Sequence, residues 1–288
     1  MTARRDPTSE NADQIAFWNA ASGETWVKFQ RSLDLELAPL GRAAIDALAP
    51  RRGERIIDVG CGCGQTTLEL ARRLGEKGAI TGIDVSGPML RVAEATARGA
   101  SLAQARFVEA DAQTFAFPQA AADAAFSRFG VMFFADPVAA FTNLRAALAP
   151  GGRLAFICWR DISENPFMTL PFEAAAHLLG EPQPATDPSA PGPFAFADPD
   201  RLHTILAAAG FTHIDLRPHD DRIGSGDLDQ STEVSLRMGP LGRALREQPH
   251  LVPAAREAVR EALTPHLTAN GVLIASASWI VTARNGSV

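Results

Sequence analysis

The sequence predicts an α/β protein whose mostly parallel sheet is covered by helices on both faces. From Gly53 onward, short apolar runs alternate with longer amphipathic stretches, a pattern typical of parallel strands linked by helices. The first apolar run, "RIIDV", leads directly into three glycines at alternate positions. Aspartates stand at the ends of the first three strand-like runs. Ligands of open α/β sheets bind at this edge, so the same observations predict both a fold and a site.

The main strands are expected over residues 55–59, 79–85, 105–111, 123–129 and 153–159. Apolar residues at helical spacing predict helices over 65–74, 87–99, 136–152 and 198–211. The second of these helices has Pro88 in its first turn, where the missing N–H costs little. The third begins at Asp136 and Pro137 and is expected to stop at Pro150 and the two glycines after it. Residues 212–220 and 272–284 would form the last strands.

Three segments fall outside this alternation, namely residues 1–44, 160–197 and 224–270. We expect a single domain over residues 1–288, with a core of about 45–159, 198–223 and 271–285, an N-terminal helical lid and two insertions. The 160–197 segment is dense in proline, which indicates either a stiff extended connection or a lid over the mouth of the sheet. Long insertions in compact domains tend to be functional, and both interpretations stay open.

The composition excludes several classes of protein. The formal charge is −6 and no cluster of basic residues forms a phosphate-tracking face, so nucleic acid is not expected as a partner. Three cysteines are an odd and sparse set rather than a disulfide framework. The pair Cys61 and Cys63, with no second pair nearby, does not predict a metal site. With no apolar leader and no apolar run of membrane-spanning length, we expect a cytoplasmic protein.

The glycine loop does not have the dinucleotide-binding spacing. That fingerprint requires Gly-x-Gly-x-x-Gly, but counting from Gly60 or Gly62 places Gln65 or Thr67 at the third position. The observed spacing is Gly60-x-Gly62-x-Gly64. Without Cβ atoms the backbone can turn sharply and contact a ligand, and the amides at the start of the next helix favour a carboxylate or phosphate. A plain strand-to-helix turn is the alternative.

The three aspartates sharpen this prediction. Asp84 ends the second strand in "GIDVS", where a carboxylate can accept two hydrogen bonds from a ribose diol. Asp111 ends the third strand in "VEADA", placed for an adenine amino group, and Asp58 lies just before the glycines, near where a ligand ammonium would sit. A solvated strand end is the ordinary explanation for any one of them. Three such residues on successive strands indicate a binding edge.

Four motifs together resemble class I S-adenosylmethionine-dependent methyltransferases. They are "IIDVGCGCG", "GIDVS", "EADA" and "LAPGGRL", and the resemblance covers roughly residues 53–160 with the helix and strand pair that follow. "FWNAASGETWVKFQ" and "FSRFGVMFFADP" are similar to segments of a small-molecule subgroup near the ubiquinone/menaquinone-type (methyltransferase type 11/25-like) enzymes. The resemblance implies a Rossmann-like, doubly wound, seven-stranded sheet with an antiparallel last strand and helical lid insertions. It implies S-adenosylmethionine (SAM) as cofactor and S-adenosylhomocysteine (SAH) as product.

The resemblance also implies a role for each matched residue. Asp58 would reach the methionine ammonium, and Asp84 would hold both ribose hydroxyls. Asp111 and the Ala112 amide would contact the adenine edge, while the Ser127 carbonyl would face the ammonium. The remaining cofactor contacts are assigned to the loop, to residues beside the adenine and to two N-terminal tryptophans, which are Gly60, Cys61, Gly62, Gly64, Val85, Met89, Trp18 and Trp26. For the tryptophans, an ordinary core position is the alternative.

Methyl transfer is an in-line displacement at a sulfonium carbon, so the protein mainly positions and desolvates the reactants. A general base is needed only if the acceptor keeps a high-pKa proton until attack. Glu173 and His177 lie four positions apart, where one helix face could present both, and Asp161 and Glu164 are further candidates. Arg128, near a strand end, could contact an acidic group on the acceptor. Surface positions are the ordinary explanation for these residues, and no catalytic residue is assigned.

Aromatic and sulfur-containing side chains gather in the segments expected to face the methyl group. Most aromatics are core residues, but even a few at the mouth of the sheet would make the acceptor hydrophobic or aromatic. The candidate pocket residues are Phe129, Met132, Phe133, Trp159, Phe167 and Phe172. The insertions over 160–197 and 224–270 would form this acceptor side.

The sequence therefore predicts an enzyme that methylates a small molecule on oxygen or carbon of a phenol- or quinone-like ring, with nitrogen as an alternative. A second hypothesis is a SAM-binding protein without methyl transfer, such as a sensor, a pathway partner or a pericyclase-type protein. A third is an NAD(P)-dependent oxidoreductase, which the glycine spacing and the Asp111–Ala112 element oppose. A monomer and a homodimer are both compatible with the sequence.

Overall fold

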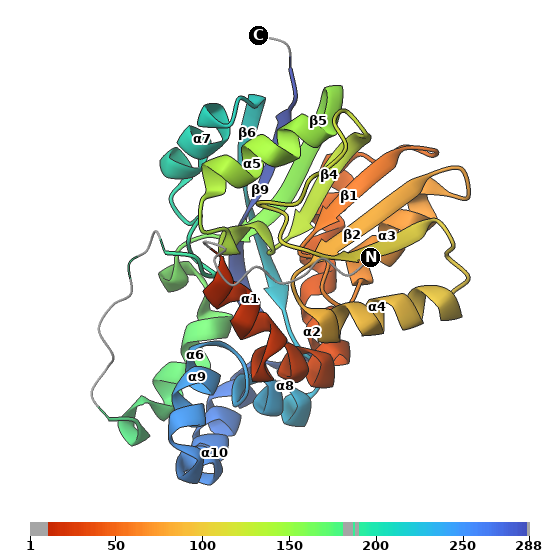
Figure 1. The fold of residues 1–288 in the computed structure, drawn as a ribbon. Helices are drawn as coiled ribbons and strands as arrows, with labels where there is room; N and C mark the ends of the chain where they lie inside the picture. Colours follow the sequence, from red (N-terminus) through yellow and green to blue (C-terminus); the bar gives the residue numbers. More distant parts are fainter. Residues whose placement is uncertain (1–10, 181–186, 188–189, 287–288) are drawn as a thin grey trace.

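The computed structural model describes residues 11–180, 187 and 190–286 and is shown in Figure 1. Its centre is a seven-stranded sheet in the order β3-β2-β1-β4-β5-β9-β6. The strands are β1 (Arg55–Val59), β2 (Ala79–Asp84), β3 (Ala105–Glu109), β4 (Ala122–Arg128), β5 (Leu148–Trp159), β6 (Thr212–Ile223) and β9 (Ile274–Arg284). Neighbours from β3 to β5 are parallel, and β9 is antiparallel to both β5 and β6. The predicted Rossmann-like sheet with an antiparallel last strand is confirmed.

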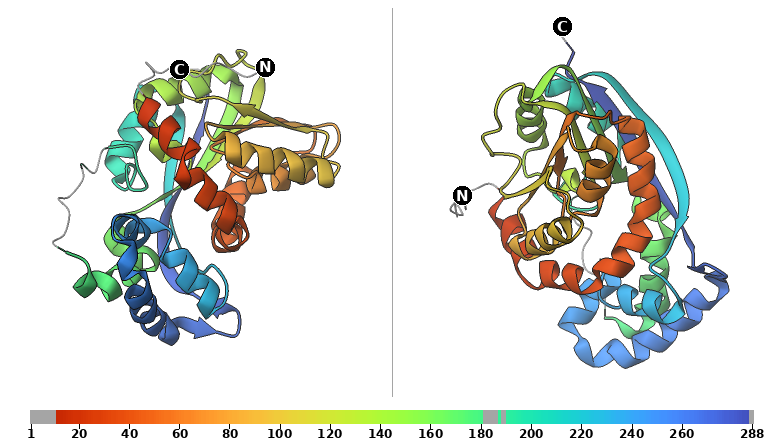
Figure 2. Two further views of the ribbon diagram at one scale, coloured as in Figure 1. Left: turned by 60° about the horizontal axis from the view of Figure 1, so that its bottom comes forward. Right: turned by 90° about the vertical axis from the view of Figure 1, so that its right-hand side faces the viewer.

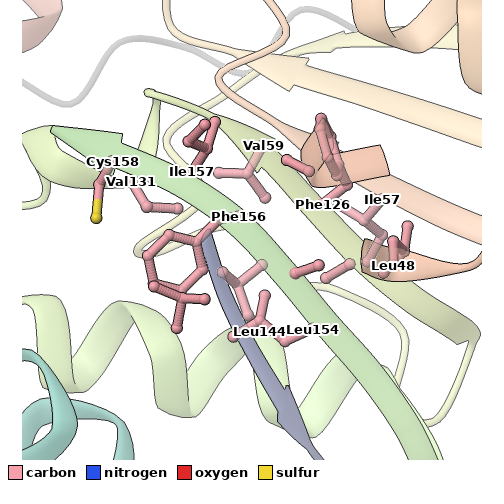
Figure 3. Close-up of a cluster of buried hydrophobic side chains, with 14 of the residues drawn as sticks. Leu48, Ile57, Val59, Phe126, Val131, Leu144, Leu154, Phe156, Ile157 and Cys158 are labelled. Atoms are coloured by element: carbon pink, nitrogen blue, oxygen red, sulfur yellow. The ribbon is translucent and has the colours of Figure 1, made fainter. Parts of the chain in front are cut away.

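The central strands are apolar along their length because both faces of the sheet are covered. In β1, every residue after Arg55 is buried. Small residues in β4, such as Ala124 and Ala125, are fully buried and leave room for the helices on either side. Large side chains such as Phe126 and Phe156 fill the layer between sheet and helices, as Figure 3 shows. This packing fixes the strand ends that carry the site.

Four helices connect the parallel strands or follow them, as the alternation predicts. They are α3 (Gln65–Leu74), α4 (Gly87–Gly99), α5 (Pro137–Ala147) and α7 (Pro199–Ala208). Asp136 begins α5 by accepting a hydrogen bond from the Ala139 amide, and Asp198 does the same for α7 with two amides. In Figure 1, α5 and α7 lie in front of the sheet and α3 lies behind it.

The N-terminal segment forms two helices, α1 (Ala12–Asn19) and α2 (Ala21–Leu48). The second half of α2 buries a stripe of apolar residues against β4, β5 and β9, so it belongs to the core as well as to the predicted lid. The N-terminal helical segment therefore extends to Leu48, beyond the predicted lid boundary at residue 44. Its first ten residues lie outside the described residues. Within the described ranges, no helix combines the length and apolar character needed to cross a membrane.

The two predicted insertions meet in a second hydrophobic cluster, which we call the helical module. It contains α6 (Pro166–Ala175) from the first insertion, and α8 (Leu228–Ser235), α9 (Gly239–Glu247) and α10 (Val252–Leu263) from the second. A short hairpin of β7 (Leu267–Thr268) and β8 (Gly271–Val272) adjoins it. Figures 1 and 2 show these helices gathered at one end of the sheet. Positions 181–186 and 188–189 of the first insertion lie outside the described residues.

Several predicted boundaries are wrong, and strand pairing explains two of them. The helix expected over 136–152 ends at Ala147, because Leu148 already pairs with Ala122 at the start of β5. The register then jumps, so that Ala124 pairs with Arg153 and residues 149–152 form an irregularity in the strand. The strand expected over 272–284 is divided at Leu273, since residues 271–272 pair with β7 instead.

Candidate active site at the carboxyl edge of the sheet

The loop after β1 is shaped by its three alternate glycines. Gly60, Gly62 and Gly64 all have positive φ, at 67°, 53° and 86°, a region that other residues rarely adopt. A Cβ on Gly60 would lie 2.6 Å from the Cα of Gly130 in the segment after β4. The glycine spacing therefore serves two purposes, a sharp turn and a close contact between two strand ends.

Asp84 connects this loop to the end of β2. Its Oδ2 accepts a hydrogen bond from the Gly62 amide at 2.7 Å, and its Oδ1 accepts one from the Ser86 amide at 2.8 Å. Burial raises the pKa of the Asp84 carboxyl, and the two amide hydrogen bonds oppose that rise. A carboxylate oxygen can accept a second hydrogen bond, so Asp84 retains capacity for hydroxyl donors.

Asp58, at the end of β1, is fully buried. Its Oδ2 accepts hydrogen bonds from the hydroxyls of Thr67 at 2.6 Å and Thr66 at 2.8 Å, both in the first turn of α3. Its Oδ1 is buried and finds no hydrogen-bond partner in the described part of the chain. Burial raises the pKa of Asp58 to about 6, although the two threonine hydrogen bonds and the nearby Arg128 each lower it. An unpaired buried carboxylate oxygen is costly, and this atom is free to accept a hydrogen bond from a ligand.

Asp111 presents a second unpaired oxygen beyond the end of β3. Its Oδ1 accepts a hydrogen bond from the Gln113 amide at 2.9 Å. Its Oδ2 is buried, and no residue between 11 and 286 that the structure describes donates to it. The adjacent Ala112 is held in place because the Asn143 side chain donates to its carbonyl at 3.0 Å. The predicted pair of Asp111 and Ala112 is thus a fixed element with one free acceptor.

Helix α1 is attached to the end of β2. The Asn19 side chain donates to the Val85 carbonyl at 2.6 Å and accepts from the Gly87 amide at 3.1 Å. The Ser86 hydroxyl donates to the Trp18 carbonyl at 2.8 Å. The Trp18 ring lies edge-to-face on Trp26 and on Phe133, with centroids 5.9 Å and 5.4 Å away. Both predicted tryptophans are therefore part of one cluster beside the Val85 end of the strand.

Met89 lies next to the loop, with its Cε 2.7 Å from where a Cβ on Gly62 would stand. Cys61 and Cys63 are buried in the loop, and burial raises the pKa of both thiols, so they remain neutral and chemically inert. The Ser127 hydroxyl donates to the Val59 carbonyl at 2.7 Å. These residues build the walls of the loop.

Arg128 is not at the surface, which corrects the ordinary explanation given for it above. Its side chain is 10% exposed and lies between α2, β4 and α3. It donates a hydrogen bond to the Gln65 side chain, and its Nη2 lies 3.7 Å from Asp34 Oδ1. The sequence placed it correctly at the end of β4 but gave no sign of burial, because both partners are remote in the chain.

Glu173 and His177, the two candidate bases, are exposed. Helix α6 ends at Ala175, and a separate 3-10 turn carries His177, so they do not share one helix face as expected. Their neighbour Ala175 belongs to the helical module. The structure therefore does not bring these side chains together with the glycine loop. Asp161 and Glu164 are also exposed, and Glu164 is paired with Arg160.

Three of the six predicted pocket residues form a continuous aromatic row. The Phe129 and Trp159 rings stack with centroids 4.0 Å apart, and the Trp159 and Phe167 rings are 4.9 Å apart. The row joins the ends of β4 and β5 to the start of α6. Phe133 instead contacts Trp18. Met132 is buried in the main core, and Phe172 packs in the helical module.

Phe129 has φ of 60°, which is unusual for a bulky residue. Its amide donates to the Ile157 carbonyl at 3.0 Å, and its ring is held by Trp159. Strained backbone of this kind persists only where surrounding contacts fix it, and it clusters at functional sites. The strain places the Phe129 ring and the Gly130 backbone at the edge shared by β1 and β4.

A polar hollow of about 540 Å³ lies beside the ends of β5 and β6, and its charged side chains are Arg160, Glu164, Asp220, Asp221 and Arg222. Arg160 directly follows the end of β5. It already pairs with Glu164 and with Asp220, and its guanidinium lies over the Trp279 ring. Because its charge is compensated within the chain, the hollow does not require an anionic ligand.

The atoms left free at the edge fit a ligand of the predicted kind. Asp58 Oδ1 and Asp111 Oδ2 are buried acceptors without a donor among the described residues. Asp84 ends β2, which lies between β1 and β3 in the sheet. An ammonium, a ribose diol and an adenine amino group are donors suited to these three positions. Asn19, Thr66 and Thr67 were missed by the sequence analysis, although two threonines opening a helix after an aspartate were a usable signal.

Comparison with known proteins agrees with this geometry. Residues 56–152 match the family model described as a methyltransferase domain. The chain is 33% identical to demethylmenaquinone methyltransferase from Thermus thermophilus over 59% of this chain and 80% of that protein. It is 37% identical to aklanonic acid methyltransferase DauC from Streptomyces over 41% of this chain and 54% of that protein, about half its length. The crystal structure of YcgJ from Bacillus subtilis superposes with a TM-score of 0.56 at 16% identity, covering 88% of this chain and 99% of that one.

Proposed function

Because the chain belongs to the class I S-adenosylmethionine-dependent methyltransferases, near the quinone-type enzymes, we propose that it transfers the methyl group of SAM to a small, hydrophobic or aromatic acceptor. SAM is the cofactor of this family. The observation that supports its place here is the pair of unpaired buried oxygens, Asp58 Oδ1 and Asp111 Oδ2, on either side of the Asp84 carboxylate.

Bound at this edge, SAM supplies a methyl group that is already activated on a sulfonium. The chain's own residues hold and orient the rest of the molecule. Asp58 receives the ammonium, Asp84 receives the ribose hydroxyls, and Asp111 with Ala112 contacts the adenine. The glycine loop lies against the methionine part, and the Ser127 carbonyl adds a second acceptor for the ammonium. Such positioning can contribute roughly 7–11 kcal/mol toward the barrier.

The cluster of Trp18, Trp26 and Phe133 acts as the lid over the cofactor. Its attachment through Asn19 to Val85 and Gly87 brings apolar rings over the end of β2. Excluding water there strengthens the hydrogen bonds and ion pairs beneath it. Val85 and Met89 complete this apolar surround.

The acceptor is proposed to lie against the aromatic row of Phe129, Trp159 and Phe167. An apolar row of aromatic rings favours a ring-shaped acceptor, and oxygen or carbon on a phenol- or quinone-like ring is the preferred methylation site. Relatives named for demethylmenaquinone and aklanonic acid support this class of acceptor. Glu173 and His177 are exposed, so the proposal assigns them no role as base.

The proposal is tested by incubating the purified protein with methyl-labelled SAM and a small-molecule extract of the source cells, followed by mass spectrometry. One labelled small molecule is the expected result, and its structure names the acceptor and the methylated atom. Asp84→Ala should abolish the label. If SAM raises the melting temperature, as a native-state ligand must, and no molecule is labelled, the proposal is wrong and a sensor or pericyclase-type protein replaces it.

A further inference from the structure

Asn165 is a fully buried polar residue between the end of β5 and the start of α6. Its side chain does not cap the helix that follows it. Instead, its Oδ1 accepts a hydrogen bond from the Ala277 amide of β9 at 2.9 Å. Its Nδ2 donates to the carbonyls of Asp161 at 2.9 Å and Arg160 at 3.3 Å. A buried side-chain amide that is satisfied on both of its polar atoms holds the segments that it joins in one arrangement.

These hydrogen bonds interrupt the ladder between β5 and β9. Trp159 pairs with Ser278 at the last position of the antiparallel register, and the Arg160 amide still donates to the Ala277 carbonyl at 3.1 Å. In a regular antiparallel pair, the Ala277 amide would return a hydrogen bond to the Arg160 carbonyl. Here the Asn165 side chain accepts from the first of these groups and donates to the second. The chain therefore leaves the sheet directly after Trp159 and turns into α6.

The turn closed by Asn165 connects two rings of the aromatic row. Trp159 precedes this turn and Phe167 follows it, and their ring centroids are 4.9 Å apart. Trp159 also stacks on Phe129. Phe167 packs against both the main core and the helical module, so the position of its ring depends on how the start of α6 is held between them. The Asn165 side chain holds it by joining the start of α6 to β9.

We propose that Asn165 is a positioning residue for the acceptor: its side chain holds Phe167 against Trp159 and so shapes the surface on which a ring-shaped acceptor lies. The inference rests on the proposed function. Asn165 itself does not touch the acceptor, because it is fully buried and both polar atoms of its side chain are occupied within the chain. Its influence passes through the Phe167 ring. A substitution of Asn165 therefore weakens acceptor binding no more than removal of that ring does.

The test measures by calorimetry how α-naphthol, a two-ring phenol, binds to the SAH-loaded protein. Phe167→Ala should weaken this binding by about tenfold. Asn165→Ala should weaken it by about threefold to tenfold and change the Kd for SAH by less than about twofold. In a Phe167→Ala background, Asn165→Ala should change the Kd for α-naphthol no further, because the ring on which it acts is gone. Additive losses in the double variant would mean that Asn165 supports the fold in general, and that result overturns the proposal.

Asn285→Ala is the matched control. The Asn285 side chain also donates to backbone carbonyls, those of Arg145, Leu148 and Ala149, but it lies at the other end of β9. Both alanine variants should lower the melting temperature, because each removes hydrogen bonds to backbone groups. Only Asn165→Ala should weaken the binding of α-naphthol. An equal loss of α-naphthol binding in the control contradicts the proposal.

Asn165→Asp takes the place of the alanine variant if that variant does not fold. It keeps the oxygen that accepts from the Ala277 amide and loses the donor to two carbonyls, so it should weaken α-naphthol binding by about threefold. If the wild-type protein binds SAH and α-naphthol and the Asn165 variants bind both equally well, only this inference fails. If it binds SAH but not α-naphthol, the aromatic row is not the acceptor surface and the inference fails with it. If it binds neither, the proposed function itself fails.

Discussion

Asn19 donates its side-chain amide to the Val85 carbonyl at 2.6 Å, across 66 positions of sequence. This hydrogen bond joins the N-terminal helix α1 to the strand end that carries Asp84. The same side chain accepts from the Gly87 amide at the start of α4. One residue thus links α1, the end of β2 and the start of α4, and the first prediction concerns this link.

Replacing Asn19 with alanine should detach the lid while leaving the core intact. The hydrogen bonds to the Val85 carbonyl and from the Gly87 amide are lost, each worth about 1 kcal/mol, so the Kd for SAH should rise by about thirtyfold. Calorimetric titration measures the change, and Asn270→Ala, at the exposed turn between β7 and β8, is the matched control. If Asn19→Ala binds SAH as tightly as the control, the attachment of α1 does not contribute to SAH binding.

Asp84→Ala removes the acceptor assigned to the ribose. Hydrogen bonds to charged groups are worth about 1.5–3 kcal/mol each. With both ribose hydroxyls assigned to Asp84, the Kd for SAH should rise by at least about a hundredfold. Because Asp84 also accepts from Gly62 and Ser86, Asp84→Asn serves as the companion that keeps the side-chain volume. Asp215→Ala, an exposed acid on β6, is the control. Unchanged SAH affinity in Asp84→Ala sinks the assignment.

The affinity for SAH should depend on pH through Asp58. Burial raises the pKa of this carboxyl to about 6, so it is ionised above pH 6 and neutral below it. Because the ammonium needs the ionised form, SAH affinity should be constant above pH 7 and fall by about tenfold at pH 5. Asp58→Asn should bind more weakly and show no such change between pH 5 and 7. A wild-type profile as flat as that of the variant contradicts the role of Asp58.

Gly60→Ala tests the close contact between the ends of β1 and β4. The new Cβ would lie 2.6 Å from Gly130 Cα, on a backbone with φ of 67°. Gly151→Ala is the control, since it has φ of 75° and open space around its Cβ. The control should lose about 1 kcal/mol of stability from the backbone alone, and Gly60→Ala should lose about 1–3 kcal/mol more from the clash. Equal losses in chemical denaturation would show that the contact is unimportant.

Phe167→Ala tests the aromatic row. Truncating the last ring of the row should raise the acceptor KM by about tenfold, because one stacked ring surface is lost, and should leave the Kd for SAH unchanged. Phe172 was also predicted to line the pocket, but its ring lies outside the aromatic row of Phe129, Trp159 and Phe167, so Phe172→Ala is the control with an unchanged KM. Identical kinetics for the two variants would place the acceptor elsewhere.

The strand and helix alternation was predictable because it depends on local periodicity and on glycine and proline positions. The end of α5 was not, since Pro150 and the glycines after it are typical of a helix stop. Pairing of Leu148 with Ala122 overrides that local pattern, and such long-range pairing leaves no trace in a single window of sequence. The packing of the two insertions into one helical module could not be predicted for the same reason.

Within the candidate site, the residues that the sequence alone placed at the edge of the sheet are those whose neighbours are close in sequence. The glycines and Asp58 lie in one motif, and Asp84 ends its strand in another. Arg128 and Asn19 contact partners 63 and 66 positions away, so their type and position alone indicated nothing beyond an ordinary polar residue. Burial is what distinguishes Arg128, and burial is a property of the folded chain.

The most direct measurement is a crystal structure of the protein with SAH. We expect the ammonium on Asp58 Oδ1, the ribose hydroxyls on Asp84 and the adenine amino group on Asp111 Oδ2, each within hydrogen-bond distance. SAH bound with its ribose away from Asp84, or with Asp58 Oδ1 and Asp111 Oδ2 still unpaired, would contradict the proposed cofactor site.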